Sequence, residues 1–222
     1  MLVFDLDGTL SDPGEGICRC VNHALSLQGE PQADHEQIKA LIGGQLDDIF
    51  KALVPVDHAV NIERLVSDYR DRMKSVGYSE NELYAGIRAF LEKMREESVP
   101  MGVCTSKRKD IAEQVLAYLE IAHCFQFVSG GDVGIHKGAQ LAQLLQEQRI
   151  DRQAVMVGDR SMDVRAAKEN ELRAVGVTWG FGTSEELADA GADFVATAVD
   201  DIEGAYRAAQ VLRVDSSRSG SQ

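Results

Sequence analysis

The sequence of 222 residues lacks a long apolar run, a run of Lys and Arg, and any paired CxxC motif. The apolar stretch at its start, Leu2 to Phe4, ends at Asp5 and is far too short for the core of a signal peptide. No other segment approaches the length that crosses a membrane. We therefore expect a cytoplasmic protein that has no membrane partner.

The charge balance excludes a second class of partner. The chain has 36 Asp and Glu against 23 Lys and Arg, which gives a formal net charge of −13 at pH 7. Because no basic cluster interrupts this balance, nucleic acid is a disfavoured partner. If the substrate is itself an anion, a local group must reverse the sign of the charge around it.

The cysteines show neither metal-binding nor redox spacing. Cys18 and Cys20 lie two residues apart in a helical pattern, on different faces, and Cys104 and Cys124 are isolated. We interpret all four as reduced thiols in the core.

The segment after the opening strand has helical character throughout. Asp12 followed by Pro13 is typical of an N-cap and a first helical residue, and this helix is expected to end near Leu27. Apolar spacing predicts further helices over about 35–42, 46–53 and 58–76. No strand is indicated between about residues 12 and 82.

From about residue 83 helices alternate with strands. Strands are expected within 99–107, 125–129, 154–163 and 173–178, and the helix after the last is capped by Thr183 with Glu186 and closed by Gly191. This alternation predicts an α/β fold with a parallel sheet covered on both faces, whose first strand is the opening one. The domains are then a core over 1–11 and 83–213, an inserted all-helical cap over 12–82, and a flexible polar tail over 214–222.

Polar residues gather where the predicted strands end. Ligands of an open α/β sheet bind at that edge. The residues concerned are Asp5 and Asp7 after the first strand, Thr105, Ser106 and Lys107 after the second, Lys137 before the helix that follows the third, and Asp159 and Asp163 after the fourth. Asp5 and Asp7 are two apart on an extended segment, so both can face one site.

This set of side chains suits a magnesium ion and a phosphate. Asp5, Asp7 and Asp159 would supply hard oxygen ligands for Mg²⁺, with the backbone carbonyl of Asp7 as one candidate ligand. The ion and Lys137 would reverse the local charge and let an anionic phosphate approach the carboxylates.

The same residues suggest a reaction. Asp5 can act as a nucleophile that forms an aspartyl-phosphate, and Asp7 can protonate the leaving oxygen and later activate water. Thr105 or Ser106 would donate a hydrogen bond to the phosphoryl group, and Lys137 would neutralise the charge that develops there.

Four segments in this order resemble the motifs of the haloacid dehalogenase superfamily: "DLDGTL", "CTSK", the Lys137 loop "GIHKG" and "GDRSMD". The block over 12–82 is similar to the small helical C1-type cap of its phosphoglycolate-phosphatase-like branch. The resemblance implies a Rossmann-like core, Mg²⁺ dependence and phosphomonoester hydrolysis through Asp5. It favours Thr105 over Ser106 as the phosphate contact, and it implies that the turn at Gly43 and Gly44 faces the active site.

For several residues the sequence leaves more than one role open. Asp163 is a helix N-cap, an orienting partner for the metal ligands or Lys137, or both. Lys107 and Arg108 balance charge at a helix start or contact substrate, and Arg160 and His136 stay unassigned. Trp179 is expected to pack against the core rather than line a pocket. Three further residues of the cap are not expected to take part: His23 is expected to be structural or exposed, and Lys39 and Lys51 to be solvated.

We therefore expect a Mg²⁺-dependent phosphatase whose cap closes over a small anionic phosphomonoester, with 2-phosphoglycolate ahead of a nucleoside 5′-monophosphate. A sugar phosphomutase would use the same Asp5 and Asp7 chemistry if water were excluded. A non-catalytic binding module is disfavoured because every catalytic position is filled. Both a monomer and a homodimer are compatible with the sequence.

Overall fold

The computed structural model describes residues 1–55, 60–131 and 136–218. Within them, six parallel strands form one sheet in the order β5-β4-β1-β6-β7-β8. The strands are β1 (Leu2–Phe4), β4 (Met101–Arg108), β5 (Val128–Gly131), β6 (Val155–Gly158), β7 (Arg173–Val177) and β8 (Phe194–Ala196). The predicted α/β fold is confirmed.

The opening strand lies in the middle of the sheet. Val3 of β1 pairs with Gly102 of β4 on one side and with Met156 of β6 on the other. The register continues for one residue past the strand, because the Asp5 N–H donates to the Val157 carbonyl oxygen at 2.9 Å. Asp5 is thus held between the carboxyl ends of β4 and β6.

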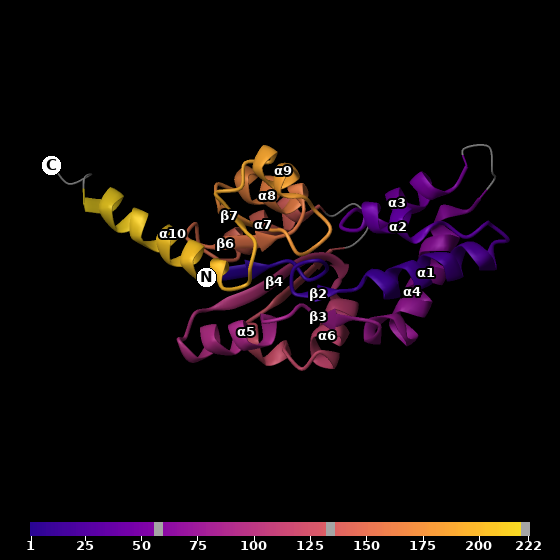
Figure 1. The fold of residues 1–222 in the computed structure, drawn as a ribbon, viewed down its shortest axis with the longest axis horizontal. Coiled ribbons are helices and arrows are strands. Elements are labelled where there is room, and N and C mark those ends of the chain that lie inside the picture. Colours follow the sequence, from indigo (N-terminus) through magenta and orange to yellow (C-terminus); the bar gives the residue numbers. More distant parts are fainter. Residues whose placement is uncertain (56–59, 132–135, 219–222) are drawn as a thin grey trace.

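Alternate strand residues face two helical layers, as the two-residue period of a strand requires. Leu2 and Phe4 join one buried cluster and Val3 joins the other. The first cluster includes residues of α5 (Ile87–Glu96), α6 (Lys109–Tyr118) and α10 (Asp201–Arg218); the second includes residues of α7 (Lys137–Gln146), α8 (Ser161–Glu169) and α9 (Ser184–Asp189). Figure 1 shows α7, α8 and α9 on one side of the sheet and α5 and α6 on the other.

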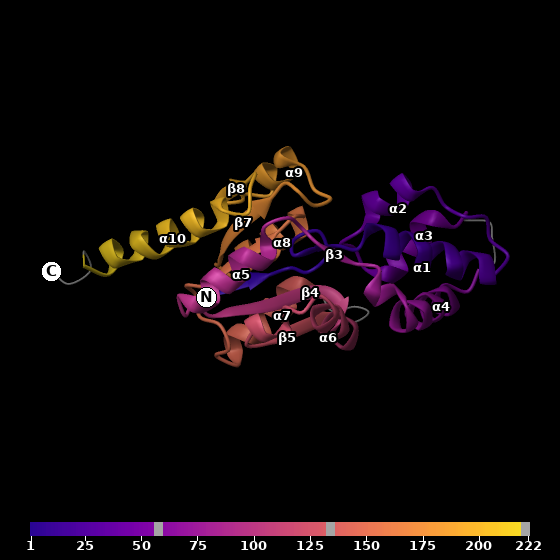
Figure 2. The ribbon, with the colours of Figure 1, turned by 60° about the horizontal axis from the view of Figure 1, so that its bottom comes forward.

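The cap forms a separate lobe of helices beyond one end of the sheet, and α10 projects from the opposite end (Figure 2). The elements of the cap are α1 (Gly14–Leu27), α2 (His35–Leu41), α3 (Leu46–Leu53), α4 (Ile62–Ser75) and the short 3₁₀ helix η1 (Gly77–Ser79). These match the predicted helices, although α4 begins at Ile62 and positions 58 and 59 of the predicted helix lie outside the described residues. Buried Phe50 packs edge-on against Tyr69 and joins α3 to α4.

A two-stranded antiparallel ribbon lies where the chain leaves and re-enters the core. It pairs β2 (Ser11–Asp12) with β3 (Glu82–Leu83), so the predicted domain boundaries fall on it. The sequence did not indicate it, because two residues are too few to show a strand period. Asp12 is consequently a strand residue and not the helix N-cap, which is Pro13, although its Oδ1 accepts a hydrogen bond from the Gly14 N–H at 2.8 Å.

Three other details differ from the sequence-based expectation. β4 continues to Arg108 instead of ending in a loop, because a register shift after Thr105 lets Arg108 pair with Gly131. β5 begins only at Val128. Helix α10 extends to Arg218, into the predicted tail, since the chain has no Gly or Pro between Gly204 and that residue to end the helix. Residues 219–222 of the tail lie outside the described residues.

All four cysteines are free and buried, as predicted for core thiols. Among the described helices, none is both long enough and apolar enough to cross a membrane.

Candidate active site

Asp5 and Asp7 each meet a different lysine. The Asp5 Oδ2 lies 3.1 Å from the Lys137 Nζ, and the Asp7 Oδ2 lies 2.7 Å from the Lys107 Nζ. The other oxygen of each carboxylate is buried and finds no hydrogen-bond partner among the described residues. A buried carboxylate oxygen without a partner is costly, so these two oxygens are suited to a ligand.

Asp5 belongs to a cluster of three buried carboxylates. Asp5, Asp159 and Asp163 each offer an oxygen, and these atoms lie within 4.8 Å of one another. Burial and the charges of Asp163 and Asp5 raise the pKa of Asp159 to about 8. Burial raises the pKa of Asp163 to about 6, against the opposing charge of Lys137. Mutual repulsion of this kind is what a divalent cation relieves, and an all-oxygen donor set fits Mg²⁺.

The predicted metal ligands are thus brought together in part. Asp5 and Asp159 share the cluster, and Asp163 completes it with a side chain that the sequence assigned to an orienting role. The Asp7 side chain pairs with Lys107 instead. Asp7 could then bind a metal ion only through its backbone carbonyl, which was predicted from the sequence as one candidate ligand.

Asp159 is held in place by the loops around it. Its Oδ1 accepts from the Thr9 hydroxyl at 3.1 Å, and its Oδ2 accepts from the Phe181 N–H at 2.8 Å. A Cβ on Gly8 would lie 2.2 Å from that Oδ2, and Gly8 has a φ of +87°, so glycine is required twice over at this position. Trp179 packs against the hydrophobic core, as expected, and its Nε1–H donates to the Thr9 carbonyl at 3.0 Å.

Lys137 begins α7 and reaches across to α8. Its ammonium contacts Asp163 as well as Asp5, and its side chain is almost fully buried. Burial alone would lower the pKa of Lys137, but the two carboxylates outweigh it and raise the pKa above its ordinary value. Lys137 is therefore charged at neutral pH. Of the loop "GIHKG", Gly134 and Ile135 lie outside the described residues, and His136 is exposed.

Asp163 is not a helix N-cap. Arg160 holds that position in α8, and the Asp163 Oδ2 accepts from the Arg160 N–H at 3.0 Å. Asp163, the third residue of α8, thus accepts a hydrogen bond from the N–H of the residue before the helix, which is one half of a capping box. Its contact with Lys137 agrees with the alternative that Asp163 orients this lysine.

Thr105, Ser106 and Lys107 are consecutive residues of β4. Thr105 is buried, and its hydroxyl oxygen accepts from the Lys107 N–H at 3.2 Å, while its carbonyl accepts from Gln140 Nε2 at 3.2 Å. The ion pair between Lys107 and Asp7 is the contact that sequence reasoning missed. Because β4 runs on to Arg108, the chain carries Lys107 to the Asp7 loop instead of turning into a helix.

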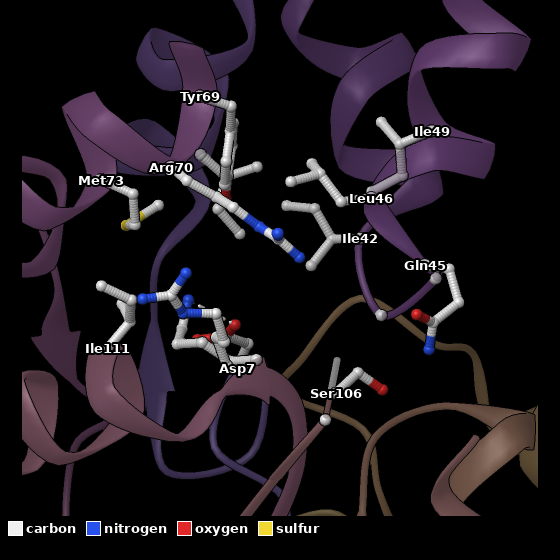
Figure 3. A pocket seen from close by; sticks show the side chains of 16 residues that line it. Asp7, Ile42, Gln45, Leu46, Ile49, Tyr69, Arg70, Met73, Ser106 and Ile111 are labelled. Carbon is white, nitrogen blue, oxygen red and sulfur yellow. Dashed lines mark ion pairs between the residues drawn. The ribbon is translucent and has the colours of Figure 1, made fainter. Parts of the chain in front are cut away.

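A pocket opens above Asp7, between the core and the cap (Figure 3). Gly43 and Gly44 line it, as expected of a turn that faces the active site. Ser106 lies on the core side, and Arg70 of α4 extends into the pocket. The apolar lining comes mostly from the cap: Ile17, Ile42, Leu46, Ile49, Tyr69 and Met73, with Ile111 from the core.

Residues 2–177 match the family model described as haloacid dehalogenase-like hydrolase. The chain belongs to this family. The family resemblance inferred from the four motifs is therefore confirmed. Asp5, Lys137 and Asp159, which come from three of these motifs, lie together at the carboxyl edge of the sheet.

Named relatives carry different activities. A 5′-nucleotidase from Pseudomonas aeruginosa is 32% identical over 190 residues, covering 84% of this chain and 86% of that protein. The tyrosine-protein kinase PtkA from Mycobacterium tuberculosis is 31% identical over 189 residues, covering 83% of this chain but only 64% of that protein. A phosphoglycolate phosphatase from Yersinia pseudotuberculosis is 29% identical over 203 residues, covering 87% of each.

Solved structures agree with the family. A haloacid dehalogenase-like hydrolase from Streptococcus pneumoniae superposes with a TM-score of 0.85 at 29% identity, covering 92% of this chain and 97% of that one. Both core and cap are included in a match of this extent, so the capped architecture is shared.

His23, Lys39 and Lys51 of the cap reach solvent at least in part, as expected of side chains without a role in the site. His23 is exposed. Lys39 lies 3.6 Å from Glu36, and exposed Lys51 pairs with Asp47 at 2.7 Å. None of the three lines the pocket above Asp7.

Proposed function

We propose that this haloacid dehalogenase-like hydrolase is a Mg²⁺-dependent phosphomonoesterase that acts through an aspartyl-phosphate on Asp5. The observation that carries the proposal is the surroundings of Asp5. It is a buried carboxylate with one oxygen that finds no partner in the described part of the chain, it lies 3.1 Å from Lys137, and it is clustered with Asp159 and Asp163. Asp5, Asp159 and Asp163 would hold Mg²⁺, which supplies charge neutralisation for the bound phosphate.

In the first step an Asp5 oxygen attacks phosphorus, and the bond from phosphorus to the ester oxygen breaks. Asp7 gives its proton to the leaving oxygen. Burial raises the pKa of Asp7 despite the opposing charge of Lys107, and the raised pKa favours the protonated carboxyl group that this step needs. Thr105 and Ser106 would donate hydrogen bonds to the transferring phosphoryl group, and Lys137 would balance its charge.

In the second step water attacks the phosphorus of the aspartyl-phosphate. Asp7, now ionised, accepts a proton from that water, and the bond between phosphorus and the Asp5 oxygen breaks. Inorganic phosphate leaves and Asp5 is restored. Closure of the cap over the pocket would exclude bulk water until the leaving group has departed.

The substrate we propose first is 2-phosphoglycolate. Arg70 extends into the pocket and could pair with the carboxylate of this substrate (Figure 3), and phosphoglycolate phosphatases are among the relatives. A nucleoside 5′-monophosphate is the second candidate. Tyr69 and the apolar cap side chains favour it, because they could cover a base and ribose, and a 5′-nucleotidase is also among the relatives.

The test is a panel of phosphomonoesters assayed for kcat/KM with and without Mg²⁺. We expect phosphate release that EDTA abolishes and added Mg²⁺ restores, and a loss of at least about a thousandfold in Asp5→Asn. Asp151→Asn, an exposed change in the core, is the control. Persistence of phosphate release in Asp5→Asn would contradict the mechanism, and isomerisation without free phosphate would instead indicate a mutase. Transfer from ATP to a tyrosine peptide without monoester hydrolysis would indicate a kinase.

A further inference from the structure

Arg160 connects the catalytic edge of the core to the cap. It directly follows Asp159, and its Nη1 donates a hydrogen bond to the Ile42 carbonyl oxygen in the cap, 118 positions away in the sequence. Its Nε lies 3.1 Å from the Glu186 Oε1 of α9. The Arg160 side chain is only 18% exposed, so these contacts are partly shielded from water. We call the contacts from Glu186 through Arg160 to Ile42 the Arg160 bridge.

The core end of the bridge is firmly held. The Glu186 Oε1 also accepts from the Ser161 N–H at 2.8 Å, at the first residue of α8. These bonds from Ser161 and Arg160 outweigh burial and lower the pKa of Glu186, which is therefore ionised at neutral pH. Arg160 would keep this partner if the cap moved away.

The cap end is a single backbone carbonyl. Ile42 is the C-cap of α2, where a carbonyl has no partner within the helix and carries the negative end of its dipole. The next residue, Gly43, has a φ of +100°, and a Cβ there would lie 3.2 Å from the Arg160 Cγ. The aliphatic stem of Arg160 therefore packs against the turn that lines the pocket.

We propose that Arg160 is a positioning residue that holds the Ile42–Gly44 turn of the cap over the catalytic aspartates. The proposal rests on the proposed function. One hydrogen bond and one glycine contact join Arg160 to the cap, whereas its partners on the core side stay in place, so the bridge can break and re-form as the cap opens and closes. Because Arg160 follows Asp159, cap closure is coupled to the loop that carries a candidate metal ligand.

The position of the cap can be measured without an assay. Spin labels at Gln37 of α2 and Glu185 of α9, introduced as cysteines at two exposed sites, report the distance between cap and core by pulsed electron paramagnetic resonance. The native thiols are buried and should stay unlabelled. We expect Arg160→Ala to broaden the distance distribution and move it to longer distances, and Arg152→Ala to leave it unchanged, since Arg152 pairs with Glu171 on the core surface.

Kinetics provide the second readout. Loss of a hydrogen bond from a charged donor should lower kcat/KM about tenfold or more in Arg160→Ala, mainly by raising KM. Arg160→Lys keeps the charge, but a single ammonium group cannot reach Glu186 and Ile42 as the broad guanidinium group does. Its kcat/KM should therefore lie between the values of Arg160→Ala and the native protein. Glu186→Gln should have a smaller effect, because the amide oxygen still accepts a hydrogen bond.

Unchanged distances and an unchanged KM in Arg160→Ala would overturn the proposal. So would a fall in kcat alone with native distances, since Arg160 would then act on the Asp159 loop and not on the cap. If Arg160→Ala does not fold, Arg160→Lys and Glu186→Gln carry the same test. An inactive native protein that shows the distance change would contradict the proposed function while leaving the bridge as a cap contact.

Discussion

The core side of the pocket carries paired charges, whereas the cap side is mostly apolar, with Arg70 as a charged exception. On the core side, Asp5 and Asp7 are buried against Lys137 and Lys107. On the cap side, Ile42, Leu46 and Ile49 line the pocket above Asp7. Charged groups buried in pairs suit bond making and breaking, because they act strongly where water is excluded. Apolar surface discriminates between leaving groups by only about 1–3 kcal/mol per methylene, which suits a choice among substrates.

The two sides also differ in how they are held. The two carboxylate oxygens of Asp159 accept hydrogen bonds from a hydroxyl and a backbone N–H. The backbone N–H of Asp5 is hydrogen-bonded to the neighbouring strand of the sheet. In the cap, the turn at Gly43 meets Arg160 by a hydrogen bond from the side chain and by van der Waals contact. A fixed floor beneath a cap that can move would let an enzyme admit a substrate and then enclose it.

The largest effect is expected on the charged side. Lys107→Met removes the cation 2.7 Å from Asp7 and leaves a buried carboxyl group that can no longer ionise readily to activate water. We expect kcat to fall by about a hundredfold, measured as phosphate release at saturating substrate. Lys109→Met, two residues further on and exposed beside Glu113, is the control. Equal activity of the two variants would show that Lys107 has no part in the reaction.

A smaller and substrate-dependent effect is expected on the apolar side. Leu46→Ala shortens a side chain that lines the pocket, so kcat/KM should fall about tenfold for a nucleoside 5′-monophosphate and by less for 2-phosphoglycolate, whose leaving group is smaller. Leu53→Ala, in the same helix but outside the pocket lining, is the control. The same loss for both substrates would contradict a role of Leu46 in reading the leaving group.

The smallest effect concerns the stability of the cap. Glu80 lies 2.7 Å from Arg72 and 3.0 Å from Arg19, and these contacts lower its pKa below the ordinary value of 4.5. A lowered pKa stabilises the folded state above pH 4.5, and this contribution is lost as the pH falls through the folded pKa.

Glu80→Gln should therefore lower the free energy of unfolding by about 1 kcal/mol at pH 7, with a difference that shrinks below pH 4.5. Urea unfolding at pH 7, 4.5 and 3 measures it. Glu113→Gln, whose partner Lys109 is 3.8 Å away at an exposed site, is the control and should show little difference at any pH. A difference that grows as the pH falls would have the wrong sign for this ion pair.

The features that the sequence predicted are those with short-range or periodic signals. The cap helices follow from apolar spacing, and the sheet follows from alternation of strands and helices. Asp5 and Asp159 could be placed at one edge because all strands of a parallel sheet end there. The ribbon at Ser11 and Glu82 was missed, since two residues carry no period. The helix over 201–218 was not predicted, and its polar end was interpreted as part of a flexible tail.

The sequence by itself determined the α/β core, the inserted helical cap and the residues that can do chemistry at the strand ends. Only the tertiary structure decided how those residues are paired: Lys137 with Asp5 and Asp163, Lys107 with Asp7, and Arg160 with Glu186 and the Ile42 carbonyl. The physical reason is distance along the chain. Local patterns extend over a few residues, whereas each of these partners is brought in by the register of the sheet and by the packing of the cap on the core.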